Sequence, residues 1–270
     1  MSSPSCCPET AWDKPTDSIE FEFDSVRYIP KGQSMTIGRY HTPVYFVKPP
    51  ISDMTTPVNN EDKKAMIIFT DVFGITERMK FISDELARLG KYHVIIPDSF
   101  RGKTMDSESD LVTWLRSVPY QPVVSQDIDS CMEYLRKEME IEGELPVGSV
   151  GFCWGGWAIA KSASEGVSWR CAVSPHPSTK IEKFIFDSNE DLMLEKTKMP
   201  FLLLPAGDDM ENLKPGGNLA ALVEEKGGGS ILFDEMKHGW VTRGDLNMPH
   251  VKRDYMKALH LILKFFADNF

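Results

Sequence analysis

The stretch that decides the fold is Ser149-Val150-Gly151-Phe152-Cys153-Trp154-Gly155-Gly156-Trp157. It follows a short, partly apolar segment at residues 145–148 and leads into residues 158–164, whose composition favours a helix. The pattern predicts a strand, a sharp turn and a helix, with Cys153 at the apex of the turn. A residue at such an apex adopts a strained backbone conformation, and small flanking glycines let the strand and the helix approach closely.

This arrangement is the nucleophile elbow of the α/β-hydrolase fold, G-x-S-x-G, with Cys153 in the position of the serine. The apex also lies at the N-terminus of a helix, where the peptide dipoles favour a thiolate. The alternative is structural, because the pattern is short and a buried cysteine often serves as a small hydrophobic residue. The rest of the chain decides between the two interpretations.

Length and composition limit the possible classes of protein. The chain has 270 residues, of which 41% are hydrophobic and 26% charged, so we expect a soluble globular protein with one large α/β domain or two small ones. The net charge of −10 argues against nucleic acids and anionic membranes as partners. We see neither an apolar run of transmembrane length nor a secretory signal, and the cysteine spacing suits no zinc site. A cytoplasmic location is therefore expected.

The N-terminal part of the chain divides into a tail and a set of short strands. Residues 1–18 lack periodicity and are expected to form a flexible tail, in which Cys6 and Cys7 are solvated, although they could bind a metal or be modified. Residues 19–270 then form a single domain. The β-rich runs at residues 19–23, 26–29, 35–40 and 44–47 predict antiparallel edge strands, and a surface loop follows at residues 49–64.

A different pattern begins at residue 65. The apolar runs at residues 65–70 and 92–97 flank a helix that Thr76 caps, with Gly90 just past its end, which predicts a right-handed βαβ unit. Further strands are expected at residues 170–174, 200–205 and 230–234, and helices near residues 125–139, 219–226 and 251–267. Cys131 is expected to be buried in the first of these helices, and a short helix at residues 109–117 is a candidate cap over the site. Alternation of strands and helices predicts an α/β fold whose central sheet is mostly parallel and flanked by helices.

Residues with catalytic chemistry follow three of the predicted strands. Cys153, then Asp208 or Asp209, then His238 occur in the α/β-hydrolase order of nucleophile, acid and histidine. Cys153 would attack a carbonyl carbon, His238 would exchange protons, and the acid would fix the histidine tautomer. We prefer Asp209 for its distance from Gly207 and hold Asp208 in reserve. A lone histidine or aspartate is usually a turn or cap residue, but three at the right strand ends favour catalysis.

The tetrahedral intermediate of such a reaction needs two N–H donors for its oxyanion. The backbone N–H of Trp154, which follows the nucleophile, is expected to supply one. The second is expected from the loop after residue 70, at the N–H of Val72.

At this point the chain resembles the dienelactone hydrolases (carboxymethylenebutenolidases), which are cysteine-dependent α/β-hydrolases. The resemblance extends from about residue 35 to the end. The motifs that carry it are Gly151-Phe152-Cys153-Trp154-Gly155-Gly156, Asp71-Val72-Phe73-Gly74, Pro97-Asp98-Ser99-Phe100-Arg101-Gly102 and His238-Gly239-Trp240. The resemblance implies hydrolysis of a lactone or ester through a thioester intermediate, with no cofactor and no metal.

The resemblance also implies roles for individual residues. Asp71 stands where the family has an acid that deprotonates the thiol as substrate binds, although the bacterial enzymes have glutamate there. Arg101 and Arg243 match the arginines that bind the substrate carboxylate, each offset from the bacterial pattern, and the alternative is an ordinary surface arginine. His176, between two prolines, and Trp240 are further candidates for substrate binding, although for His176 we favour the alternative of a packed loop residue.

Three hypotheses of function follow from these residues. The first is a hydrolase for a small dienelactone-like ester or lactone, with no nucleic-acid or membrane partner, acting as a monomer or homodimer. The second is a thioesterase or general carboxylesterase that uses the same triad. The third is a non-catalytic protein in which Cys153 reports oxidation.

Overall fold

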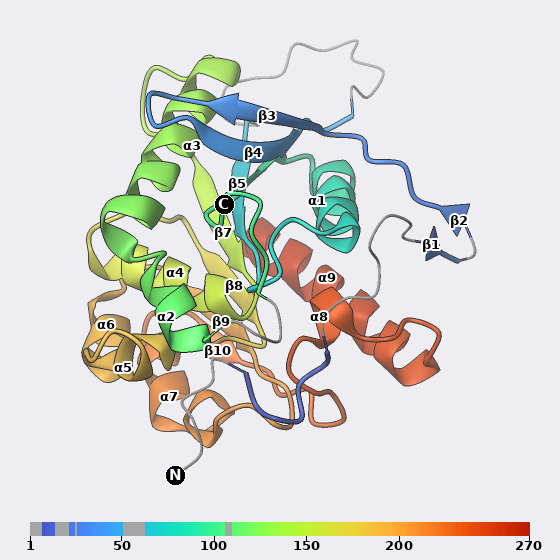
Figure 1. Cartoon of the computed structure of the whole chain (residues 1–270), viewed down its shortest axis with the longest axis vertical. Helices are drawn as coiled ribbons and strands as arrows, with labels where there is room; N and C mark the ends of the chain where they lie inside the picture. The colour runs from blue at the N-terminus through green and yellow to red at the C-terminus, as the bar shows by residue number, and fades with distance from the viewer. Residues whose placement is uncertain (1–6, 14–21, 25, 51–62, 106–109) are drawn as a thin grey trace.

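The apolar runs of the sequence form a twisted central sheet in the computed structural model, which describes residues 7–13, 22–24, 26–50, 63–105 and 110–270 (Figure 1). Among the described residues, eight strands form this sheet in the order β10-β9-β8-β7-β5-β6-β4-β3. Their bounds are β3 Gln33–Ile37, β4 Thr42–Val47, β5 Ala65–Phe69, β6 His93–Pro97, β7 Val147–Gly151, β8 Ala172–Pro175, β9 Phe201–Leu204 and β10 Gly229–Ser230.

The strand directions confirm a mostly parallel sheet. All neighbouring strands from β10 to β6 run parallel, whereas β4 pairs antiparallel with both β3 and β6. The parallel strands are buried on both faces, which explains their continuous apolar sequences. Because the carboxyl ends of parallel strands meet at one edge of a sheet, the loops after β5, β7, β8 and β9 lie near one another.

Two expectations about strands need correction. Among the described residues, the first two short strands, β1 (Glu22–Phe23) and β2 (Val26–Arg27), form a separate two-stranded sheet and do not extend the edge of the central sheet. Phe23 instead stacks on Phe81 at 5.0 Å between ring centroids, which fixes this hairpin against a helix. The last strand, β10, is shorter than predicted and earlier in the chain, and Phe233 is joined to Ala206 by a single bridge.

Helices cover both faces of the sheet (Figure 1). They are α1 Glu77–Gly90, α2 Leu111–Arg116, α3 Ser125–Glu138, α4 Trp154–Ser164, α5 Ile181–Phe184, α6 Glu190–Lys196, α7 Asn218–Glu224, α8 Trp240–Arg243 and α9 Pro249–Asn269, with a π-helical turn at Tyr120–Val124 and a 3-10 turn at Glu211–Leu213. Helices α1, α8 and α9 pack on one face and α2 to α7 on the other, so each face carries its own apolar core.

The ends of α1 show what the sequence can predict locally. Thr76 caps the helix as predicted, since its Oγ1 accepts a hydrogen bond from the Met79 N–H at 3.2 Å. Gly90, however, is the last helical residue, and the left-handed residue beyond it is Lys91, with φ of 61°. Glycine is required at position 90 because a Cβ there would lie 2.2 Å from the ring of Tyr92.

Three further expectations concern Cys131, the loop at residues 49–64 and membrane-spanning helices. Cys131 is fully buried in α3, as predicted, and burial raises its pKa well above the usual value. The predicted surface loop at residues 49–64 lies largely outside the described residues. Within the described part of the chain, no helix combines the length and the apolar composition needed to cross a membrane.

Candidate active site

Cys153 lies at the apex of a sharp turn between β7 and α4. Its backbone has φ of 52° and ψ of −110°, a conformation that is costly for any residue with a side chain. The turn can close because its flanking residues are glycines: a Cβ on Gly151 would lie 2.3 Å from the carbonyl oxygen of Gly155, and one on Gly155 would lie 2.4 Å from that of Phe69. The strained backbone of Cys153 is therefore part of the tight turn that places its sulfur at the apex.

His238 and Asp209 form a close pair on the neighbouring loops. The Nδ1 atom of His238 lies 2.6 Å from Oδ1 of Asp209, and both side chains are almost completely buried. The second carboxylate oxygen of Asp209 accepts a hydrogen bond from the Ala206 N–H at 2.8 Å, which fixes the orientation of the carboxylate. Asp209 thus orients the ring and favours the tautomer with the proton on Nδ1.

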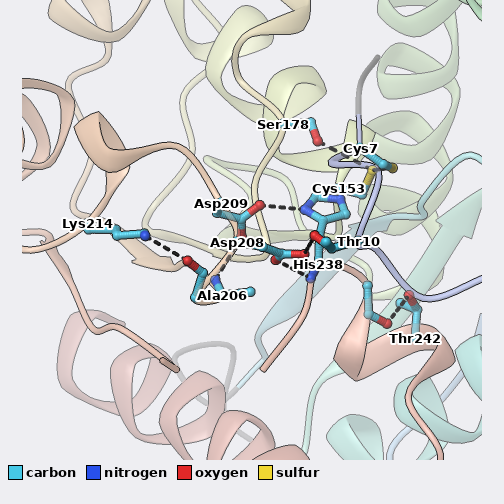
Figure 2. A network of polar contacts seen from close by, with 12 residues as sticks. Cys7, Thr10, Cys153, Ser178, Ala206, Asp208, Asp209, Lys214, His238 and Thr242 are labelled. Carbon is cyan, nitrogen blue, oxygen red and sulfur yellow. Dashed lines mark hydrogen bonds and ion pairs between the residues drawn. The ribbon is translucent and has the colours of Figure 1, made fainter. Parts of the chain in front are cut away.

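Asp208 has a different position. Its Oδ1 accepts a hydrogen bond from the backbone N–H of His238 at 2.6 Å, and its Oδ2 accepts one from the Thr10 hydroxyl at 2.5 Å (Figure 2). Of the two candidate acids, Asp209 therefore contacts the histidine ring and Asp208 contacts the histidine backbone.

The ring of His238 faces the sulfur of Cys153. A ring nitrogen of His238 lies within 4.8 Å of that sulfur, and Nε2 has no hydrogen-bond partner among the described residues. Burial alone lowers the pKa of His238, but the Asp209 carboxylate and the nearby cysteine sulfurs outweigh burial and hold the pKa well above its usual value. A protonated His238 and the N-terminus of α4 both stabilise a thiolate at Cys153.

Val72 and Trp154 carry the two backbone N–H groups that are candidates for an oxyanion hole. Val72 follows β5 and Trp154 is the first residue of α4, directly after Cys153. Outside the internal bonds of helices and strands, neither N–H donates to a backbone carbonyl in the described part of the structure. Both donors therefore remain available to an oxygen atom of a substrate.

Asp71 is held in a buried ion pair with Arg243. Its Oδ2 accepts hydrogen bonds from the Thr242 hydroxyl at 2.7 Å and from Nη1 of Arg243 at 3.1 Å, while Oδ1 accepts one from the Phe73 N–H at 2.9 Å. Burial and the proximity of Cys153 raise the pKa of Asp71, although Arg243 partly opposes them. The pair thus places a carboxylate and a guanidinium beside the thiol.

The two arginines identified in the sequence have different surroundings. Arg243 is almost fully buried beside the site, with its guanidinium 4.8 Å from the ring centroid of Phe73. Arg101 forms a bidentate ion pair with Asp127 of α3, at 2.7 and 3.0 Å, and its side chain is 37% exposed. Arg243 therefore lies in the site near Cys153. Arg101 instead pairs with Asp127.

His176 and Trp240 lie close together next to His238. The ring of His176 meets that of His238 edge-on, at 5.1 Å between centroids, and both of its nitrogens lack partners within the described residues. Burial and the charge of His238 lower the pKa of His176 well below its usual value, which leaves the ring neutral. Trp240 is fully buried against His176 and Phe233.

A row of aromatic rings joins the elbow to α2. Trp154 packs against Phe100 at 4.7 Å between centroids, and Phe100 stacks on Trp114 of α2 at 4.6 Å. The short helix predicted at residues 109–117 thus contacts Trp154, the residue after Cys153, through Phe100. Part of the predicted segment, residue 109, lies outside the described residues.

The segment at residues 7–13 corrects the expectation of a solvated tail. The sulfur of Cys7 lies 3.6 Å from that of Cys153 (Figure 2). The Trp12 N–H donates a hydrogen bond to the carbonyl of His238 at 3.0 Å. No sequence pattern predicted this contact, because the segment has neither apolar periodicity nor a recognisable motif. Cys6 and the rest of the predicted tail lie outside the described residues.

One trio of side chains in the described residues has the reach to hold a metal ion. The ligand atoms of Cys7, Cys153 and His238 all lie within 4.8 Å of one another. They come from three distant segments, so no local spacing in the sequence could have indicated them. The trio includes the candidate nucleophile and its base, so a metal bound there would occupy the active site itself.

The strand order and the sharp turn that presents Cys153 between β7 and α4 are those of the α/β-hydrolase fold. The family model described as the dienelactone hydrolase family matches residues 53–268, and the chain belongs to this family. A candidate dienelactone hydrolase of Klebsiella pneumoniae shares the fold, with a TM-score of 0.63 and 18% identity over 87% of this chain and 98% of that one.

Curated relatives resemble the chain over different lengths. The mouse carboxymethylenebutenolidase homolog is 33% identical over 116 residues, which are 41% of this chain and 45% of the mouse protein. The human homolog is 27% identical over 152 residues, 54% of this chain and 56% of the human one. The chain therefore spans about half the length of these relatives. An uncharacterized AIM2 family protein of Schizosaccharomyces pombe is 20% identical over 98% of this chain and 99% of its own.

Proposed function

We propose that this protein hydrolyses small esters or lactones, with Cys153 as the nucleophile. The observation that carries the proposal is the arrangement of Cys153 at a strained elbow, within 4.8 Å of a ring nitrogen of His238, the residue whose Nδ1 lies 2.6 Å from Asp209. Membership of the dienelactone hydrolase family supports the same chemistry. Because thiolate, base and orienting acid are held by three different loops, the arrangement serves acyl transfer better than it serves packing.

The first half of the reaction forms a thioester. The sulfur of Cys153 attacks the carbonyl carbon, and the carbonyl oxygen becomes an oxyanion that accepts hydrogen bonds from the N–H groups of Val72 and Trp154. Collapse of this intermediate breaks the bond to the leaving oxygen, which takes a proton from His238. In a lactone the leaving oxygen stays attached to the acyl group, so ring opening gives a thioester that still carries the new hydroxyl or enol.

The second half releases the acid. His238 accepts a proton from water as the water oxygen attacks the thioester carbon, and the same two N–H groups bind the second oxyanion. The carbon–sulfur bond then breaks and Cys153 is regenerated. Asp209 keeps the imidazole oriented through both steps, since its carboxylate holds Nδ1 and leaves Nε2 to face the reacting atoms.

The buried pair of Asp71 and Arg243 suggests a substrate that bears a carboxylate. Such a carboxylate would bind the guanidinium of Arg243 and compete with Asp71 for it. Asp71, with its raised pKa, would then be able to take the proton of the Cys153 thiol. In this proposal an anionic substrate increases the fraction of Cys153 that is present as the reactive thiolate.

The test is steady-state hydrolysis of p-nitrophenyl acetate and of a dienelactone by the reduced protein. We expect Cys153→Ala to abolish turnover of both substrates. Cys171→Ala is the matched control, because Cys171 is equally buried but lies before β8 in the core, and we expect this variant to retain activity if it stays folded. Turnover by Cys153→Ala at the wild-type rate would refute the proposal. A Cys153→Ala variant that melts like the wild type excludes unfolding as the cause of the loss.

A further inference from the structure

The segment at residues 7–13, here called the N-terminal strap, lies over the candidate active site. Two hydrogen bonds fix it on the catalytic loops, from the Trp12 N–H to the carbonyl of His238 at 3.0 Å and from the Thr10 hydroxyl to Asp208 at 2.5 Å. Cys153 and His238 are fully buried in this arrangement. The surface hollow lined by Glu144, Gly166 and Arg170 flanks the start of β7, away from the elbow at its carboxyl end.

The strap brings a second thiol to the nucleophile. The sulfurs of Cys7 and Cys153 are 3.6 Å apart, and no disulfide joins them in this structure. A disulfide requires about 2.05 Å between sulfurs, so the strap must move by only about 1.5 Å to form one. Cys7 is partly exposed, whereas Cys153 is fully buried, so a small oxidant from solvent meets Cys7 first.

Two cationic side chains favour thiolates at this pair. Burial lowers the pKa of Arg243, but Asp71 and the sulfurs of Cys7 and Cys153 raise it, and a ring nitrogen of His238 lies within 4.8 Å of both sulfurs. Reactive cysteines are found in such electropositive, partly exposed surroundings, because the thiolate is the reacting form. The machinery that would activate Cys153 toward an ester therefore also serves a reaction between the two sulfurs.

We propose that Cys7 forms a reversible disulfide with Cys153 when the protein meets a hydroperoxide, and that this bond switches the active site off. The Cys7 thiolate attacks hydrogen peroxide, so a sulfur–oxygen bond forms, the oxygen–oxygen bond breaks and hydroxide leaves to become water. The Cys153 thiolate then attacks the Cys7 sulfenic acid, the sulfur–sulfur bond forms, and hydroxide leaves with a proton from His238. Two thiols are oxidised by two electrons and one peroxide is reduced to two waters.

The other described cysteines make a selective reaction possible. Cys131 and Cys171 are fully buried in the two cores, away from the strap. Burial raises the pKa of Cys131 well above its usual value and that of Cys171 to about 12. Both stay protonated and unreactive at neutral pH, so among the four described cysteines peroxide should consume the Cys7–Cys153 pair.

The disulfide would also protect the nucleophile. A cysteine without a nearby resolving thiol proceeds from sulfenic to sulfinic acid, which dithiols do not reduce, whereas a disulfide is reversible. Using the loss of ester hydrolysis as a measure of the switch rests on the proposed function. Formation of the disulfide between Cys7 and Cys153 does not depend on it.

The experiment treats the reduced full-length protein with hydrogen peroxide in the presence of EDTA, so that metal binding plays no part. Peptide mass spectrometry without reductant is expected to find residue 7 joined to residue 153 within one chain, and dithiothreitol is expected to restore the two thiols. Ester hydrolysis should fall in step with the cross-link and recover with it. If no ester is hydrolysed but the cross-link forms, the proposed function fails and the disulfide stands.

Two serine variants give the matched comparison. Cys7→Ser should form no cross-link, should hydrolyse esters like the wild type when reduced, and should lose activity irreversibly in peroxide. Cys6→Ser, its neighbour in sequence, should behave like the wild type. The proposal is overturned if the cross-link is absent from the wild type, if it survives in Cys7→Ser, or if it joins two chains. Melting curves of both variants check that the fold is intact.

Discussion

At the scale of single residues, the two adjacent acids after β9 provide a sharp contrast. Asp209 contacts the ring of His238, whereas Asp208 contacts its backbone N–H. We expect Asp209→Asn to lower kcat for ester hydrolysis by roughly 10²-fold or more, because the ring loses its orienting charge and its favoured tautomer. Asp208→Asn is the control and should cost far less. Equal losses in the two variants would contradict the assignment of Asp209 as the acid.

The same pair predicts how stability depends on pH. The pKa of His238 is raised in the folded protein, while an unfolded chain has a value of about 6.5. The stabilisation from protonated His238 is therefore fully present below about pH 6.5 and is lost as the pH rises through the folded-state pKa, by up to about 1.4 kcal/mol per pH unit. In Asp209→Asn the main opposing charge is gone, so this decline should largely disappear.

Chemical denaturation at pH 7, 8 and 9 measures this effect. The wild type and Asp209→Asn contain the same thiols, so the difference between their slopes isolates the histidine. The wild type should lose free energy of unfolding more steeply with rising pH than the variant does. Parallel slopes would mean that Asp209 does not control the protonation of His238.

At the scale of elements, the elbow depends on glycines that accept close backbone contact. A Cβ at position 155 would lie 2.4 Å from the carbonyl oxygen of Phe69, whereas one at position 143 would meet nothing within 4 Å. We expect Gly155→Ala to reduce the free energy of unfolding by about 2 kcal/mol, because β5 and α4 must separate. Gly143→Ala should change it by less than about 0.5 kcal/mol. Denaturant midpoints measure both, and equal midpoints would show that the elbow relaxes freely.

Elements with a long or continuous apolar pattern were predictable from the sequence, and short ones were not. The buried strands β5 and β9 and the capped helix α1 follow local rules of pattern and capping. Helices α5, α6 and α8 have four to seven residues, too few for a helical period to appear. β10 has two residues, and its place depends on its pairing with β9 rather than on its own sequence.

In the candidate site, too, the residues that follow a local pattern were predictable and the contacts between distant segments were not. Cys153, Asp209 and His238 could be identified because each follows a predictable strand or motif, and strand order brings them together. The choice between Asp208 and Asp209 rested on distance from Gly207, and the structure puts Asp209 at the ring. Contacts that join distant segments had no local signal, among them the pairing of Arg101 with Asp127 and the approach of Cys7 to Cys153.

At the scale of the whole molecule, the charge of the protein and the charge of its site have opposite effects on an anionic ester. The chain carries a net charge of −10, which repels a carboxylate-bearing substrate at long range. Within the site, the guanidinium of Arg243 attracts the same carboxylate over a short distance and away from solvent ions. Salt screens the long-range repulsion, because the Debye length is about 10 Å at 0.1 M, but it hardly reaches a buried contact.

Raising the salt concentration from about 0.01 to 0.3 M should therefore increase kcat/KM for a carboxylate-bearing ester by roughly twofold or more, and leave that for p-nitrophenyl acetate unchanged. Arg243→Lys should lower kcat/KM for the anionic ester by roughly tenfold at both salt concentrations, since lysine cannot reproduce the bidentate contact. Arg101→Lys is the matched control, because its partner is Asp127, and should leave the selectivity unchanged. If Arg243→Lys weakened hydrolysis of both esters equally, Arg243 would act only through Asp71, and the protein would be a general carboxylesterase without a carboxylate site.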